Sequence, residues 1–224
     1  MKELFNENVT SIETYIMFKI TERTAELRNQ LTAKGREPIS LAMGAPTCRP
    51  PQFVIDEIKK LVDIDAMHTY SSPKGEKTYL EAVANRMKKR FGVELNPKTE
   101  ICSLIGSKEG IANMIRALIN PKHDIKDKDI ILTPNPSYAS YKEMVKVSGG
   151  YSYSVPLNPE NNFMPDLDEV WDNLIKDGFD PKKVKALLVN YPSNPLGATA
   201  TLDYYKKAVE FCKKHHILLI GDSA

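Results

Sequence analysis

The chain has 224 residues, of which 42% are hydrophobic and 27% are charged, a composition typical of a globular protein with one large domain or one domain plus an accessory piece. A net charge of +2 gives no indication of a nucleic-acid partner, and no apolar run reaches the roughly 20 residues that a membrane helix needs. The three cysteines, Cys48, Cys102 and Cys212, lie far apart, without a CxxC pair or a histidine at metal-ligand spacing. We therefore predict a protein of the reducing cytoplasm, with neither a disulfide framework nor a metal site.

The first half of the chain is predicted to be mainly helical. Its expected elements are a helix over residues 13–33, an extended piece over 38–43, a helix over 51–62 and a helix over 75–90. Gly35 and Gly92 follow the first and last of these helices, where glycine commonly ends a helix, and Gly44-Ala45-Pro46 has the composition of a turn. Because the first 48 residues lack the regular alternation found later, we assign 1–48 to an arm and part of a smaller domain, and 49–224 to a large domain.

The second half alternates between strands and helices. Strands are expected over residues 100–105, 129–133, 150–155, 184–190 and 217–221, with helices over 107–119, 138–147, 166–175 and 202–213 between them. This alternation predicts an α/β fold with a largely parallel sheet and helices on both faces. The last strand has no helix after it to cover the sheet, so we expect the domain to be incomplete.

Four segments at the starts of helices, each expected to follow a strand, carry unusual residues, and a parallel sheet places such segments on one edge. In the first, which spans Ile105–Gly110, Gly106 permits a tight turn, Ser107 can cap the helix, and the free N–H groups of the first helical turn make an anion site. An ordinary capped helix is the alternative. In the second segment, two prolines hold Tyr138 at a helix start, where its ring can stack on a flat ligand or pack in the core.

The other two segments carry polar side chains at the ends of apolar strands. Asn194 lies between two prolines after the strand over 184–190, and such a rigidly held amide suits a ligand or, alternatively, a structural Asx turn. Asp222 ends the strand over 217–221, where a buried carboxylate needs a cationic or donor partner. A helix-capping aspartate is the alternative for this residue.

In their order and spacing these segments resemble one family. The matching stretches are Leu104–Gly110, Pro134–Tyr138, Asn190–Ala198 and Gly221–Ala224, with Met43–Pro46 and His68–Ser72 nearer the start. They resemble the fold-type I pyridoxal-phosphate-dependent aminotransferases of class I/II, and the nearest subgroup is LL-diaminopimelate aminotransferase. The resemblance runs through nearly the whole chain.

The resemblance implies a site for pyridoxal 5′-phosphate. In that site, Ser107 and Lys108 offer backbone N–H groups to the cofactor phosphate, Tyr138 stacks on the pyridine ring, and Asn194 bonds the 3′ oxygen of the ring. Asp222 is the implied catalytic residue, because it pairs with the ring nitrogen and keeps that nitrogen protonated.

The resemblance also implies an assembly and a reaction. Tyr70 matches a tyrosine that reaches the phosphate of the partner subunit's cofactor, so a homodimer is expected, and Gly44 and Ala45 border the substrate. The expected activity of the complete cytoplasmic protein, in amino-acid biosynthesis, is transfer of an amino group to a 2-oxo acid from LL-diaminopimelate, aspartate, glutamate or alanine.

The chain departs from the family pattern at several positions. Leu196 stands where the family usually has threonine, and Thr47 and Cys48 stand where an acidic residue is common. No lysine or arginine matches the one that attaches the cofactor or the one that binds the substrate carboxylate, so residues 1–224 alone are expected to be inactive. The alternatives are a pyridoxal-phosphate-dependent C–S β-lyase and a non-catalytic, aminotransferase-like ligand-binding domain.

Overall fold

The computed structural model describes residues 4, 6–37, 39, 41, 44 and 47–223. The chain divides into two compact units, one of Met1–Lys19 with Gly106–Ala224 and one of Ile20–Ile105. Each unit is considered by itself. The units do not follow the predicted boundary at residue 48, and that boundary stays a prediction about the domains of the whole protein.

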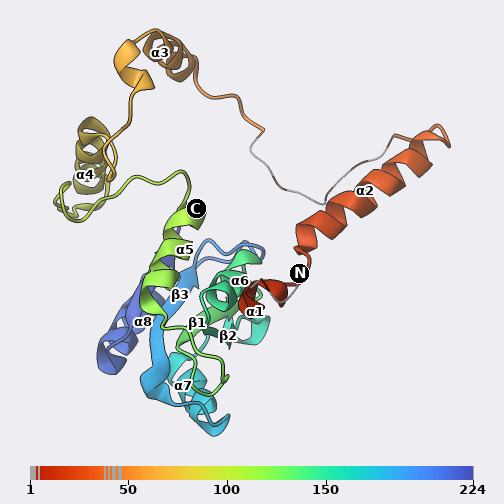
Figure 1. The fold of residues 1–224 in the computed structure, drawn as a ribbon, viewed down its shortest axis with the longest axis vertical. Helices are drawn as coiled ribbons and strands as arrows, with labels where there is room; N and C mark the ends of the chain where they lie inside the picture. The colour runs from red at the N-terminus through yellow and green to blue at the C-terminus, as the bar shows by residue number, and fades with distance from the viewer. Residues whose placement is uncertain are drawn as a thin grey trace. The chain divides into compact units, whose positions relative to one another are not determined.

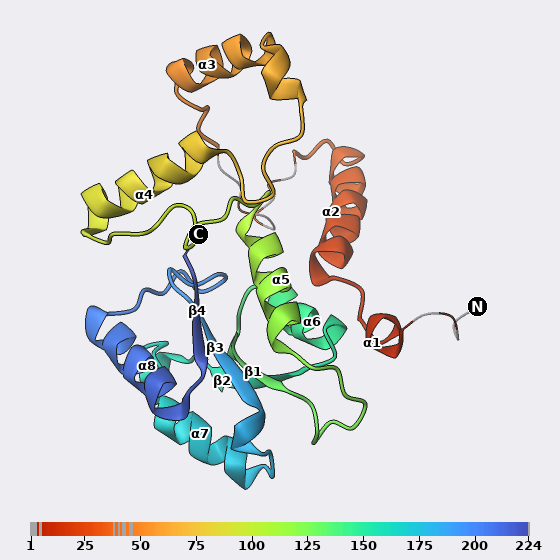
Figure 2. The same ribbon diagram turned by 60° about the vertical axis from the view of Figure 1, so that its left-hand side comes forward.

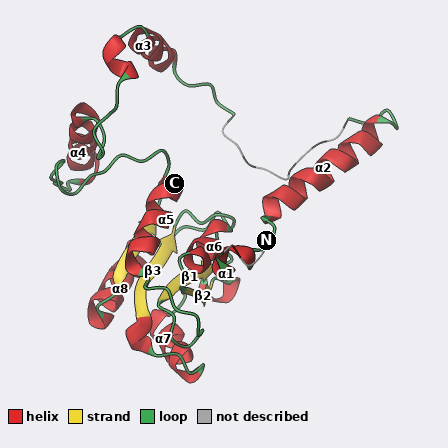
Figure 3. Cartoon of the chain, in the orientation of Figure 1, coloured by secondary structure: helices red, strands yellow, loops and turns green. Residues whose placement is uncertain are grey.

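The larger unit is built on a four-stranded sheet in the order β2-β1-β3-β4. Figure 2 labels all four strands, and Figure 3 draws the strands in yellow. The strands are β1 (Ile130–Asn135), β2 (Tyr151–Pro156), β3 (Val184–Asn190) and β4 (Leu218–Asp222). Every neighbouring pair is parallel, so all four strands end on the same edge. The predicted parallel α/β sheet is therefore confirmed.

Helices cover both faces of this sheet, as Figure 2 shows. They are α5 (Ser107–Leu118), α6 (Ser140–Val147), α7 (Leu167–Lys176) and α8 (Leu202–His215), and short 3-10 turns lie at Pro159–Asn161 and Pro181–Lys183. Successive side chains of a strand point to opposite faces. Ile130 and Leu132 accordingly belong to the core with α7 and α8, whereas Ile131 belongs to the core with α5 and α6.

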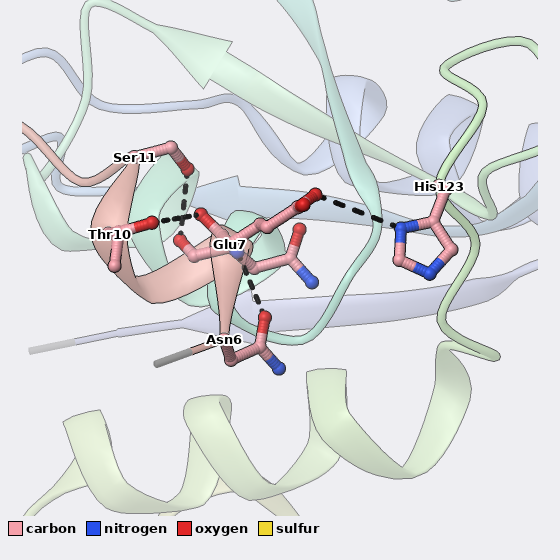
Figure 4. Close-up of polar contacts among 6 residues, drawn as sticks. Asn6, Glu7, Thr10, Ser11 and His123 are labelled. Carbon is pink, nitrogen blue, oxygen red and sulfur yellow. Dashed lines mark hydrogen bonds and ion pairs between the residues drawn. The ribbon is translucent and has the colours of Figure 1, made fainter. Parts of the chain in front are cut away.

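A short amino-terminal helix, α1 (Glu7–Thr10), packs on α6 and is shown in Figure 4. The Asn6 side chain caps it by accepting a hydrogen bond from the Asn8 N–H at 2.9 Å. Lys146 of α6 donates to the Ser11 carbonyl oxygen. Glu7 Oε2 lies 3.9 Å from His123 Nδ1, but both side chains are almost fully exposed, so water screens this ion pair. The bond from Lys146 thus ties the end of α1 to α6 within the larger unit.

The smaller unit is mainly helical. Its elements are most of α2 (Ile16–Thr32), α3 (Gln52–Val62), a 3-10 turn over Asp65–His68, and α4 (Lys77–Phe91), which are visible in Figure 1. These helices agree with the three predicted in this region to within a few residues at each end. Gly92 ends α4 with a φ of 69°, a conformation that favours glycine. The predicted extended piece over 38–43 lies mostly outside the described residues.

The predicted strand over residues 100–105 is wrong. These residues are all described, and they form a loop in which the Ser103 N–H donates to the Lys74 carbonyl oxygen at 2.8 Å. Gly75 lies so close to this loop that a Cβ atom there would be 2.2 Å from Ser103 Oγ. Ile105, predicted to be in the strand, is 97% exposed. An apolar stretch forms a strand only where a neighbouring strand accepts its hydrogen bonds, and sequence pattern alone does not reveal that neighbour.

Candidate functional site

The predicted site residues of the larger unit gather at the carboxyl edge of its sheet. Strands β3 and β4 end side by side, with Asn190 opposite Asp222. Tyr138 follows the end of β1, and Asn194 follows the end of β3. Since the strands are parallel, these segments open on the edge where α/β folds bind ligands.

Asp222 is held by a tyrosine that the sequence did not single out. The hydroxyl of Tyr141, in α6, donates to Asp222 Oδ2 at 2.5 Å. Tyr141 is fully buried, and this burial, together with the hydrogen bond to Asp222 and its charge, raises the pKa of Tyr141 well above its usual range. The Tyr141 hydroxyl therefore stays protonated and donates its hydrogen bond to Asp222. Asp222 itself is half-buried, and among the described residues its Oδ1 has no hydrogen-bond partner.

Asn194 lies in a turn that its own backbone closes. The Ser193 N–H donates to the Ala198 carbonyl oxygen, and the Gly197 N–H donates to the Ser193 carbonyl oxygen, each at 2.7 Å. These two backbone bonds close the turn without a side-chain hydroxyl. Leu196 can therefore stand where the aminotransferases that the sequence resembles usually have threonine. The Asn194 side chain is exposed, and its amide makes no hydrogen bond to any described residue.

Asn190 is a second residue to which sequence analysis gave no role in the site. It is the last residue of β3, just before this turn, and it is 4% exposed. Its Nδ2 donates to the Asp222 carbonyl oxygen at 3.0 Å. Its Oδ1 accepts a hydrogen bond from the Asn194 backbone N–H at 2.9 Å. One buried amide thus joins the segments that carry Asn194 and Asp222.

The start of α5 lies at the same edge, although no strand precedes it. The residue before the helix is Gly106, not Ser107 as predicted, and no side chain caps the helix. A Cβ atom at Gly106 would meet nothing within 4 Å, so the space at its Cβ side is open. Lys108 Nζ lies 5.7 Å from the centroid of the Tyr138 ring and 5.8 Å from that of Tyr15, which brings α5 to the junction after β1.

Tyr138 is half-buried between this lysine and Tyr141. The two tyrosine rings meet edge to face, with centroids 5.5 Å apart. A hydrogen bond with Ser140 lowers the pKa of Tyr138, and the positive charge of Lys108 acts in the same direction. The ring is therefore fixed by its neighbours, whereas its predicted stacking on a ligand stays a prediction.

Three predicted residues belong to the other unit or to its undescribed part. Tyr70 is fully exposed, and Gly44 is exposed as well. Ala45 lies outside the described residues. The roles predicted for these residues stay predictions.

The groups at the sheet edge fit pyridoxal 5′-phosphate. The uncapped first turn of α5 can receive a phosphate on its N–H groups. The unpartnered Asn194 amide can bond a ring oxygen, and the unpartnered Oδ1 of Asp222 can accept from a protonated ring nitrogen.

Within the described chain, no cluster of histidine, cysteine or acidic residues could hold a metal ion, and no helix is long and apolar enough to cross a membrane.

The family model and the sequence relatives that match this chain are all aminotransferases. The model of the family "Aminotransferase class I and II" matches residues 36–224. LL-diaminopimelate aminotransferase of Aquifex aeolicus is 36% identical over 220 residues, which are 98% of this chain and 53% of the relative. The enzyme of the same name from Natranaerobius thermophilus is 39% identical over 192 residues, 86% of this chain and 47% of the relative.

Solved structures agree with these sequence relatives. Apo-BacF from Bacillus subtilis is similar with a TM-score of 0.84 at 28% identity, covering 97% of this chain and 52% of that one. Aspartate aminotransferase from Thermus thermophilus with maleate gives 0.80 at 25% identity, covering 98% and 53%. The chain spans about half the length of the curated relatives it matches.

The Tyr141 hydroxyl should stabilise the fold through its bond to Asp222. We expect Tyr141→Phe in the full-length protein to lower the free energy of unfolding by about 1.5–3 kcal/mol, the range for a hydrogen bond to a charged group. Tyr153→Phe is the matched control, because Tyr153 donates to the exposed Asp177 at 2.7 Å and water can replace that bond. Urea unfolding measures both, and equal losses would contradict the special role of the Tyr141 bond.

Proposed function

The chain belongs to the class I and II aminotransferases, and from this premise we propose that the whole protein transfers an amino group between an amino acid and a 2-oxo acid, with pyridoxal 5′-phosphate as its cofactor. The observation that carries the proposal is Asp222 at the end of β4, half-buried, with Oδ2 bonded to Tyr141 and Oδ1 open. A carboxylate in such a place is costly without a cationic partner, and a protonated ring nitrogen is such a partner.

The chain's own residues have distinct tasks in this proposal. The N–H groups of Ser107 and Lys108 bind the phosphate, where the positive end of the α5 dipole favours an anion. Tyr138 stacks on the ring, and Asn194 donates to the ring's 3′ oxygen. Asp222 holds a proton at the ring nitrogen through its negative charge. When bound, the cofactor acts as an electron sink for the charge left on the substrate's α-carbon.

For the substrate, we propose LL-diaminopimelate or a related amino acid such as aspartate, glutamate or alanine. The support is the name shared by the two sequence relatives described above. Structural similarity does not discriminate further, because an aspartate aminotransferase at a TM-score of 0.80 and an aromatic aminotransferase at 0.71 both match this chain.

We further propose a cytoplasmic homodimer. In it, Tyr70 binds the phosphate of the partner subunit's cofactor, and Gly44 and Ala45 border the substrate. The full exposure of Tyr70 leaves its hydroxyl available for such a contact. The cytoplasmic location is supported by Cys48, Cys102 and Cys212, all of which are free thiols.

Asp222→Asn should separate cofactor binding from catalysis. The amide keeps the shape of the side chain but removes the charge that holds the ring nitrogen protonated. We expect the full-length variant to bind the cofactor and to release the substrate's α-proton on the order of 10²–10³-fold more slowly. Single-turnover loss of an α-deuteron, followed by NMR, measures this step, with cofactor occupancy read by absorbance.

The control for this experiment is Asp203→Asn, which removes an exposed carboxylate on α8. It should leave the rate of α-deuteron loss unchanged. If Asp222→Asn reacts within a factor of a few of the unmodified protein, Asp222 has only a structural role, and the proposed function loses its main support.

Tyr70→Phe should weaken cofactor binding in the dimer. It removes one hydrogen bond to a charged phosphate, worth about 1.5–3 kcal/mol, so the dissociation constant of the cofactor should rise by roughly 10- to 150-fold. Tyr79→Phe is the matched control, since Tyr79 is also exposed in the same unit. Sedimentation checks that both variants remain dimers, and an unchanged dissociation constant in an intact dimer would refute the assignment.

Turnover of different amino acids tests the substrate proposal. With 2-oxoglutarate as acceptor (or oxaloacetate for the glutamate donor), we expect the full-length protein to give a higher kcat/KM with LL-diaminopimelate, aspartate, glutamate or alanine than with phenylalanine or tyrosine. A preference for an aromatic donor would refute the substrate class. Pyruvate released from cystathionine would instead indicate a C–S β-lyase.

A further inference from the structure

The Asn190 side chain donates one hydrogen bond and accepts another. It donates from Nδ2 to the Asp222 carbonyl oxygen at 3.0 Å and accepts on Oδ1 from the Asn194 N–H at 2.9 Å. The two partners are separated by 28 residues in the sequence, and each belongs to a segment proposed to hold the cofactor ring. No other described side chain is hydrogen-bonded to both segments.

An amide is well suited to this position. The side chain is 4% exposed, and an apolar residue in its place would remove both hydrogen bonds. A carboxylate here would accept from the Asn194 N–H but would repel the Asp222 carbonyl oxygen. A serine hydroxyl is too short to reach both partners from the same backbone position. The side chain therefore sets the distance between two main-chain positions.

We propose that Asn190 is a positioning residue, which fixes the Asn194 amide and the Asp222 carboxylate at the separation that the cofactor ring requires. This inference rests on the proposed function, because the ring's 3′ oxygen and its nitrogen are the atoms that Asn194 and Asp222 are proposed to bind. The exposed Asn194 side chain has no described partner of its own, so its orientation depends on its backbone, which Asn190 holds.

The test compares two equally buried polar residues of the sheet. Thr133 on β1 is also 4% exposed, and its hydroxyl bonds the Ser152 hydroxyl at 2.5 Å, but it is hydrogen-bonded to neither Asn194 nor Asp222. We expect Asn190→Ala in the full-length protein to raise the dissociation constant of pyridoxal phosphate about tenfold, the equivalent of one lost hydrogen bond. Thr133→Val should change it less than twofold. Absorbance titration of the apoprotein gives the constants, and urea unfolding gives the stability of each variant.

A double-mutant cycle distinguishes positioning from general support of the fold. Asn194→Ala removes the side chain proposed to touch the ring but keeps the backbone N–H that bonds Asn190. In that background, Asn190→Ala can affect the cofactor only through Asp222, so it should weaken cofactor binding by less than about threefold, while its effect on unfolding should persist. Additive effects on cofactor binding would overturn the inference.

The remaining outcomes are also decisive. If the unmodified apoprotein does not bind pyridoxal phosphate, the proposed function fails, and this inference fails with it. If the unmodified protein binds and Asn190→Ala behaves like Thr133→Val, only the inference fails. Should Asn190→Ala not fold, Asn190→Ser replaces it, and the same tenfold and threefold expectations apply.

Discussion

The parallel pairing of β3 with β4 is the constraint on which the candidate site depends. It places Asn190 opposite Asp222, so that two strands end in polar residues at the same level of the sheet. A shift of this register by one residue would turn Ile220 away from its core and Asp222 away from Tyr141. The apolar contacts that fix the register therefore also fix the carboxylate.

The sheet and its helices were predictable because their signals are local. β3 begins and ends at the predicted residues, and its buried run of apolar side chains needs no knowledge of the rest of the chain. The same is true of the polar residues that follow the strands, Tyr138, Asn194 and Asp222. Parallel topology alone brings these residues to a common edge, so their proximity followed from element order.

The contacts that organise the site were not predictable in this way. Tyr141 and Asp222 are separated by 81 residues, and a tyrosine on the inner face of a helix has the same sequence signal whether it packs or donates a hydrogen bond. Asn190 closes an apolar strand, where an asparagine is equally typical of a simple strand end. The wrong strand over 100–105 has a related cause, since pairing with a distant neighbour decides whether an apolar segment becomes a strand.

The bond from Tyr141 also affects how a cation can approach the Asp222 carboxylate. A guanidinium group binds a carboxylate best with two parallel N–H groups, one to each oxygen. At Asp222 one oxygen is already occupied by a donor whose raised pKa keeps its proton in place. Oδ1 is the carboxylate oxygen that has no partner among the described residues, and it suits a cation that presents one N–H along one line, as a protonated heteroaromatic nitrogen does. The buried tyrosine thereby competes with any ligand that needs both carboxylate oxygens and leaves a contact to Oδ1 alone unhindered.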